Sequence, residues 1–228
     1  MISTARNWMC TTWDVEGSIR PGGPTQIWAR GVAATKDRRW APGEAISVYF
    51  LEGASNKHDA FMDIAKEWFR EGISLRLEKV ANAKDANIRV AFQPNINQSY
   101  VGTENRLIDS SKATLNVADV TPDRVLHEFG HALGLAHEFT HPDMNFQWIK
   151  EEVYQDYMTE YKWEKEKVDQ WVFEKFSPDR CEVITDFDKR SVMVYPIRKN
   201  WTTSHVEIQI PSQLSAGDLE TIQRIYPA

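Results

Sequence analysis

The chain has 228 residues, of which 42% are hydrophobic and 26% are charged, and its net charge is −6. This composition is typical of a globular domain, with no dense Lys/Arg cluster that would indicate a nucleic-acid partner and no apolar run near the ~20 residues of a membrane span. The first residues, MISTARNWMCTTWD, hold no apolar segment of signal-peptide length. We therefore expect no nucleic acid and no membrane as partner. We expect a cytoplasmic location, or secretion if a leader was removed.

The N-terminal part of the sequence is predicted to be irregular. Residues 18–26, SIRPGGPTQ, hold two prolines and two glycines, which interrupt regular structure. We expect an N-terminal extension over residues 1–39 and an ordered domain over residues 40–228.

The ordered domain is predicted to begin with a strand and a helix. AISVYFLEG, residues 45–53, has the composition of a strand that ends at a glycine. Residues 57–72 repeat apolar side chains every three to four positions, as an amphipathic helix does, and Gly72 lies just past its end. Four strands are then expected, the first two of them half-buried because apolar and polar residues alternate. They are residues 73–80, 86–93, 98–104 and 112–119.

The second half of the chain is predicted to be mostly helical. The residues TPD at 121–123 offer an N-cap hydroxyl, a proline for the first turn and an acid at the positive end of the helix dipole. Residues 146–176 are rich in charge and predict a pair of solvated amphipathic helices. The closing LSAGDLETIQRIYP predicts a last helix with a capping box between Ser215 and Asp218.

The helix after residue 121 contains HEFGHALGLAHE, which holds three of the six histidines. His127 and His131 are four residues apart, so on a helix both imidazoles lie on one face and can bind one zinc ion. Glu128 lies one position round the helix, where it can reach water beside the metal without ligating it. Gly134 can end the helix with a positive φ, so that the chain turns back and His137 supplies a third ligand. Three protein ligands leave one position open, which is typical of catalytic rather than structural zinc.

The histidine pattern is completed downstream by SVMVY, residues 191–195. Met193 is expected to form the methionine turn that accompanies this long form of the motif. A purely structural role for the histidines is disfavoured, because the three histidines, the glutamate and the glycine occur in the required order. His141 is expected to be a loop residue, since the helix should have ended before it.

On these residues the chain resembles the metzincin metallopeptidases, most closely their astacin-like members of bacterial and fungal type. Besides HEFGHALGLAHE and SVMVYP, five segments resemble successive landmarks of that family: WAPGEAISVYFLEG, AKEWF, ANIRVAF, SYVGT and LSAGDLETIQRIYP. The resemblance implies an α+β fold of the zincin type, with a twisted mixed sheet and helices above a zinc cleft and a mostly helical lower subdomain. It also implies that residues 40–228 form the catalytic domain, and an edge strand expected within 98–104 would bind extended substrate.

The resemblance further implies a zinc-dependent metalloendopeptidase with one catalytic Zn²⁺ and protein or peptide substrates. Glu128 is expected to be the general base, and Tyr195, two residues beyond Met193, is expected to stabilise the oxyanion. The sequence departs from the astacin pattern at Val194, where a histidine is usual, and in EFTHPD, which lacks the usual arginine. These departures concern specificity and maturation more than zinc chemistry.

The two cysteines are Cys10 and Cys181. A thiolate is a good zinc ligand, and Cys10 lies in the expected extension. Cys10 is therefore a candidate latency ligand for the open zinc position, with residues 1–39 as a pro-segment. A free thiol and a Cys10–Cys181 disulfide are the alternatives, because the flanking residues match no known switch motif.

Two other functions stay open at this point. A zinc hydrolase of a small amide or peptide-like metabolite would use the same histidines and the same glutamate. A non-catalytic binding module with this fold would have no need of Glu128, so the presence of that residue disfavours it.

Overall fold

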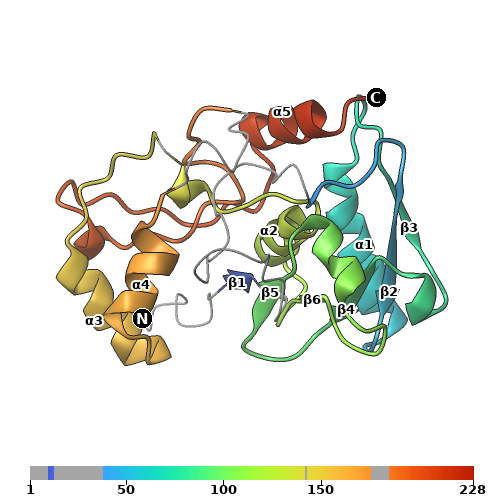
Figure 1. Cartoon of the computed structure of the whole chain (residues 1–228), viewed down its shortest axis with the longest axis horizontal. Coiled ribbons are helices and arrows are strands. Elements are labelled where there is room, and N and C mark those ends of the chain that lie inside the picture. The colour runs from blue at the N-terminus through green and yellow to red at the C-terminus, as the bar shows by residue number, and fades with distance from the viewer. Residues whose placement is uncertain (1–9, 13–37, 142, 176–184) are drawn as a thin grey trace, which may run out of the picture.

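The structure is a computed structural model that describes residues 10–12, 38–141, 143–175 and 185–228. Figure 1 shows a β-sheet with helices α1 and α2 on one side of the molecule and helices α3 and α4 on the other. Helix α2 lies on the side of the first part that is nearer to α3 and α4, so the segment with the histidine motif faces the second part.

The sheet has six strands in the order β1-β5-β6-β4-β2-β3. Strand β5 is antiparallel to β6, and every other neighbouring pair is parallel. The α+β class and the mixed sheet expected from the sequence are therefore confirmed. The strands are β1 Cys10–Thr12, β2 Ala45–Phe50, β3 Arg76–Lys79, β4 Ile88–Ala91, β5 Asn97–Ser99 and β6 Leu115–Asn116.

Strand β4 is buried along its whole length, so the expectation of a half-buried strand was wrong. It lies between β2 and β6, and even Arg89 is only 3% exposed. The Arg89 guanidinium donates to backbone carbonyls, which replace water around the buried cation. The accepting carbonyls belong to Ala86, Asn105, Ile108 and Lys112. Arg89 thereby fixes the loop that leads into β6.

The segment expected as a strand at 98–104 divides into two elements. Strand β5 ends at Ser99, and Gly102–Leu107 forms a 3₁₀-helix. The sequence did not predict β1, which pairs in parallel with β5 so that Cys10 lies opposite Asn97. Strand β5 is consequently an inner strand, and β1 occupies the sheet edge beyond it.

The helices follow the predicted order, with two local differences. The first helix changes to a 3₁₀ turn where Trp68 is fully buried, and the fourth continues as a π-helical turn. No helix in the described part of the chain combines the length and the apolarity needed to cross a bilayer. The helices are α1 Ser55–Ala65 with the 3₁₀ turn Lys66–Trp68, α2 Pro122–Ala132, α3 Lys150–Tyr161, α4 Lys165–Val168 with the π turn Asp169–Phe173, and α5 Ala216–Ile225.

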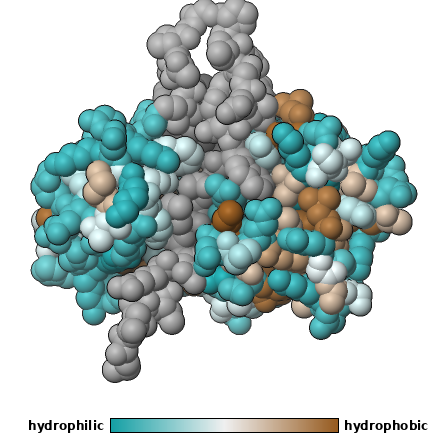
Figure 2. Space-filling view, turned by 90° about the horizontal axis from the view of Figure 1, so that it is seen from below, coloured by the Kyte–Doolittle hydropathy of each residue, from teal (hydrophilic) through white to brown (hydrophobic). Residues whose placement is uncertain are grey.

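Two hydrophobic cores support the site. The first core joins the sheet, α1, α2 and α5, and the second core joins α3, α4 and the π turn. Seen from below, the face of the α3 and α4 part is mostly hydrophilic, as expected of solvated helices (Figure 2). The segment 191–195 connects the two cores, because Val192 and Met193 belong to the first core and Val194 and Tyr195 belong to the second core.

Candidate metal centre

Helix α2 begins with proline in its first turn, as predicted. The backbone of Thr121 is extended, and its carbonyl accepts the Val125 N–H at 3.0 Å. The expected capping role of the Thr121 hydroxyl was wrong, because Oγ1 has no hydrogen-bond partner among the described residues. The first turn is instead fixed by the restricted φ of Pro122 and by this backbone bond.

Helix α2 ends at the glycine, as predicted. Gly134 has φ +99°, its N–H bonds to His131 O at 2.8 Å, and the Leu135 N–H bonds to Gly130 O at 2.9 Å. These two bonds form a Schellman motif, which reverses the chain direction. His137, three residues later, is thereby returned to the face of the helix that holds the other two histidines.

The three motif histidines converge on one point. His137 Nε2 lies 3.1 Å from His131 Nε2 and 3.1 Å from His127 Nε2. All three side chains are buried, and they form a group able to hold a metal ion. A tetrahedral ion with bonds of about 2.0–2.1 Å separates its ligand atoms by roughly 3.3 Å. The spacing of the three nitrogens therefore fits one zinc ion.

Backbone carbonyls set the tautomers of two of these rings. His127 Nδ1 bonds to Val192 O at 2.6 Å, and His131 Nδ1 bonds to Leu135 O at 2.8 Å. A carbonyl can only accept, so each Nδ1 carries the proton and each Nε2 keeps its lone pair toward the centre. Burial lowers the pKa of His127 well below its usual value, and His131 acts in the same direction. The imidazole is thus neutral, as a metal ligand must be.

The other predicted site residues lie on helix α2, against it, or beside His137. Glu128 is completely buried on α2 beside His127. Tyr195 is 8% exposed, and its ring stands edge-on to His137 with the centroids 5.6 Å apart. Met193 is fully buried against α2 at Gly130, where an added Cβ would collide with the Met193 sulfur.

The structure does not bring His141 into this group. His141 lies in a loop after the 3₁₀ turn Glu138–Thr140, and its Nε2 bonds to Thr185 O at 2.9 Å. Cys10 belongs to strand β1, and Cys181 lies outside the described residues. The latency ligand, the free thiol and the Cys10–Cys181 disulfide therefore all stay open as interpretations of Cys10.

Two aromatic side chains donate hydrogen bonds to carbonyls at the end of α2, and the sequence did not predict these contacts. Trp40 Nε1 donates to Ala132 O at 2.8 Å, and the Tyr226 hydroxyl donates to Leu133 O at 2.7 Å. They bind carbonyls that a helix end leaves without intrahelical partners. Burial raises the pKa of Tyr226 to about 12, so its hydroxyl stays protonated and donating. No local pattern reveals such contacts, because Trp40 and Tyr226 are 92 and 93 residues from their respective partners in the sequence.

Glu138, which directly follows His137, packs against the methionine turn. Its N–H donates to Met193 O at 2.9 Å, and its carboxyl Oε1 accepts the Asp188 N–H. Burial raises the pKa of Glu138 to about 8, with smaller contributions from Asp218 and Asp188 in the same direction. The hydrogen bond from the Asp188 N–H opposes this rise in the pKa.

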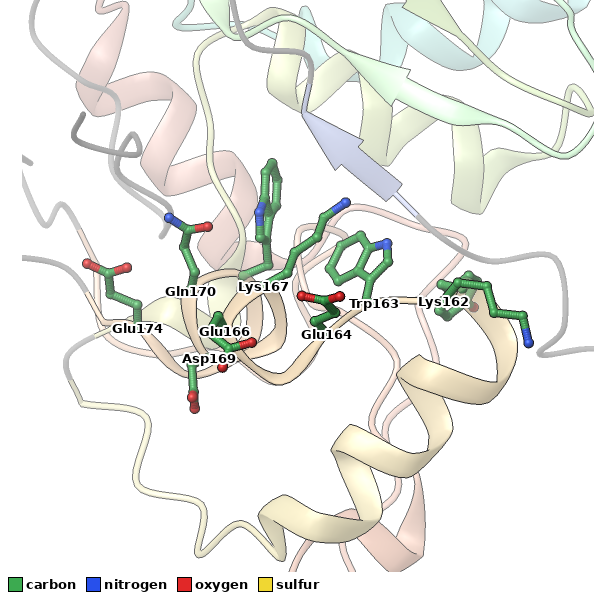
Figure 3. Close-up of a pocket in the computed structure, with 10 residues that line it drawn as sticks. Lys162, Trp163, Glu164, Glu166, Lys167, Asp169, Gln170 and Glu174 are labelled. Atoms are coloured by element: carbon green, nitrogen blue, oxygen red, sulfur yellow. The ribbon is translucent and has the colours of Figure 1, made fainter.

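A pocket of 1110 Å³ lies in the helical part, between the end of α3 and the π turn. Figure 3 shows the labelled side chains that line it, among them Lys167, whose ammonium lies 4.1 Å from the Trp163 ring centroid. None of the three motif histidines lines this pocket. It is therefore distinct from the metal centre.

Comparisons with known proteins agree with this geometry. Residues 32–226 match the model of the peptidase family described as Astacin. One structure of myroilysin is 31% identical, with 86% of this chain and 98% of that chain covered and a TM-score of 0.79. Another is 28% identical, with 96% and 91% covered and a TM-score of 0.65.

A more distant structure shares the fold. High choriolytic enzyme 1, a hatching enzyme and zinc protease from the medaka fish Oryzias latipes, is 16% identical, with 89% of this chain and 99% of that chain covered and a TM-score of 0.58. Among curated protein sequences, none matches the chain.

Proposed function

The chain belongs to the astacin family of peptidases, and from this premise we propose which of its residues perform peptide hydrolysis. It is a zinc metalloendopeptidase, and its substrates are proteins or peptides. The observation that supports the site most strongly is the convergence of three buried Nε2 atoms, two pairs of which are 3.1 Å apart. We assign the zinc ligands as His127, His131 and His137.

Glu128 is the proposed general base. When bound, Zn²⁺ acidifies water and polarises a carbonyl group. The Glu128 carboxylate takes a proton from the attacking water and delivers it to the nitrogen of the leaving amine, so that the scissile C–N bond breaks and the glutamate returns to its starting ionised form. Its complete burial keeps this proton transfer in a region of low dielectric constant.

Tyr195 is the proposed oxyanion donor, because its ring lies beside His137 at the edge of the centre. Tyr195→Phe removes only the hydroxyl. We expect kcat to fall by roughly 10²- to 10³-fold, the cost of losing one oxyanion donor, while the chain still binds one Zn²⁺. Steady-state kinetics with an unfolded protein substrate measure this change. Tyr154→Phe is the control, since the Tyr154 hydroxyl bonds to Asp169 in the helical part; an equal loss in both variants would refute the assignment.

Strand β1 supports a latent state of the enzyme. An extended substrate that pairs with β5 would have to displace β1, which already pairs with all three residues of β5. We propose that residues 1–39 form a pro-segment, that residues 40–228 form the catalytic domain, and that the Cys10 thiolate takes the open zinc position.

Cys10→Ala tests the thiolate. We expect the initial rate of protein hydrolysis to rise, because the open position becomes available to water. Cys181→Ala is the matched control and is expected to leave the rate unchanged. If both variants change the rate equally, a Cys10–Cys181 disulfide is the better explanation; if neither does, the thiolate is no latency ligand.

A hydrolase of small amides would share every residue assigned above. The two functions differ in the substrate that is turned over. Unfolded casein and a panel of dipeptide amides, assayed side by side with the zinc-loaded chain, separate them. We expect cleavage of casein at internal bonds, and exclusive turnover of the small amides would contradict an endopeptidase.

A further inference from the structure

A path of hydrogen bonds connects helix α5 with the first histidine of the metal centre. Asp218 is 2% exposed, and its Oδ1 accepts the Ser191 hydroxyl at 2.5 Å. Ser191 Oγ in turn accepts the Met193 N–H at 2.9 Å. This N–H and the Val192 carbonyl belong to the same peptide group, and that carbonyl accepts from His127 Nδ1 at 2.6 Å. A buried carboxyl group is thus connected to a metal-ligating imidazole through one hydroxyl and one peptide group.

The direction of each bond in this path is determined. Ser191 has one hydroxyl proton, and its oxygen already accepts from the backbone, so that proton points to Asp218. Asp218 Oδ2 also accepts two N–H groups, from Val192 at 3.0 Å and from Ser215 at 2.8 Å. Burial raises the pKa of Asp218, and these hydrogen bonds act in the opposite direction. Three donors around the carboxyl group suit its ionised form.

We propose that Asp218 is a positioning residue of the metal centre that acts on His127 through this path. A histidine that ligates a metal usually donates its second N–H to a carboxylate or a carbonyl, which fixes the ring and raises the basicity of the ligating nitrogen. Here the carbonyl is the direct partner, and the carboxylate polarises it from two hydrogen bonds further away. Aligned hydrogen bonds in a buried environment strengthen one another. The inference rests on the proposed role of His127 as a zinc ligand.

Asp218 has a separate role in α5, which provides a control. Its backbone N–H donates to Ser215 Oγ at 3.0 Å, as part of the capping box of α5. Ser215→Ala removes this cap but leaves the path from the carboxylate to His127 intact. Asp218→Asn and Ser191→Ala do the reverse. Both change the hydrogen-bond path to His127, and both leave the Ser215 hydroxyl that caps α5 in place.

The test is the affinity of the full chain for Zn²⁺, measured by competition with a chelator for the wild type and the three variants. We expect Asp218→Asn to weaken Zn²⁺ binding about tenfold. This is the lower end of the loss in metal affinity found when a group that hydrogen-bonds to a metal ligand is replaced. Ser191→Ala should weaken binding in the same direction, and Ser215→Ala should leave it unchanged. The visible absorption of the Co²⁺-substituted chain should shift in the first two variants alone, which a general loss of stability would not produce.

Two results would overturn the proposal. One is wild-type affinity and an unchanged Co²⁺ spectrum in both Asp218→Asn and Ser191→Ala. The other is a loss of Zn²⁺ affinity in Ser215→Ala as large as that in Asp218→Asn and Ser191→Ala, which would show that Asp218 acts only by capping α5. Ser191→Ala decides the question even if Asp218→Asn does not fold. A wild-type chain that binds no Zn²⁺ would contradict the proposed function itself, which distinguishes the two failures.

Discussion

Glu128→Gln is expected to lower kcat/KM for protein hydrolysis by roughly 10²- to 10⁴-fold, the contribution of a general base. Glutamine has the shape of glutamate but cannot take a proton from water at neutral pH. Because Glu128 is no ligand in the proposed site, the variant should still bind one Zn²⁺ with near wild-type affinity. Hydrolysis of unfolded casein and the zinc content of the same samples measure both quantities.

The control for this variant removes a glutamate charge elsewhere. Glu71 is exposed at the end of the first helical region, and Glu71→Gln should leave both activity and zinc content unchanged. Substantial activity in Glu128→Gln would show that another group accepts the proton. Loss of zinc from Glu128→Gln would show that the residue holds the metal site together rather than acting as base.

Gly130→Ala is expected to damage the metal centre although alanine favours a helix more than glycine does. A Cβ at this position would collide with the Met193 sulfur and would lie 3.1 Å from the Trp68 ring. Overpacking a buried site costs about 1–3 kcal/mol, and the higher helix propensity of alanine offsets about 1 kcal/mol of that cost. We expect a lower free energy of unfolding and weaker Zn²⁺ binding, measured by urea denaturation and by chelator competition.

A double-mutant cycle tests the cause of this effect. In a Met193→Ala background the collision with the sulfur is absent and only the 3.1 Å contact with the Trp68 ring remains, so Gly130→Ala should cost much less. If Gly130→Ala costs the same in both backgrounds, the contact with Met193 is not what selects glycine at this position.

The sequence was sufficient to predict that the three motif histidines converge, because the determinants of this geometry are local. The helical spacing of His127 and His131, the positive φ of Gly134 and the return of His137 all lie within 11 residues. The capping box of α5 was predicted for the same reason, since Ser215 and Asp218 are three residues apart and both of its hydrogen bonds are present.

The features that the sequence did not predict depend on contacts between distant segments. Strand β1 is three residues long and is defined only by its pairing with β5. Arg89 interrupts a strand pattern as a solvent-facing residue would, yet carbonyls from a later loop allow its burial. Asp218 also accepts hydrogen bonds from Ser191 and Val192, which lie 27 and 26 residues before it in the sequence. No local pattern therefore indicates these bonds.

The most direct test of the zinc centre is the return of activity to metal-free enzyme. The chain is stripped of metal with a chelator, and casein hydrolysis is measured as Zn²⁺ is added in substoichiometric steps. We predict no activity without metal, and a linear rise that ends at one Zn²⁺ per chain, in agreement with the group that His127, His131 and His137 form in the described part of the chain. Hydrolysis by the metal-free chain, or a rise that does not depend on these histidines, would contradict the account.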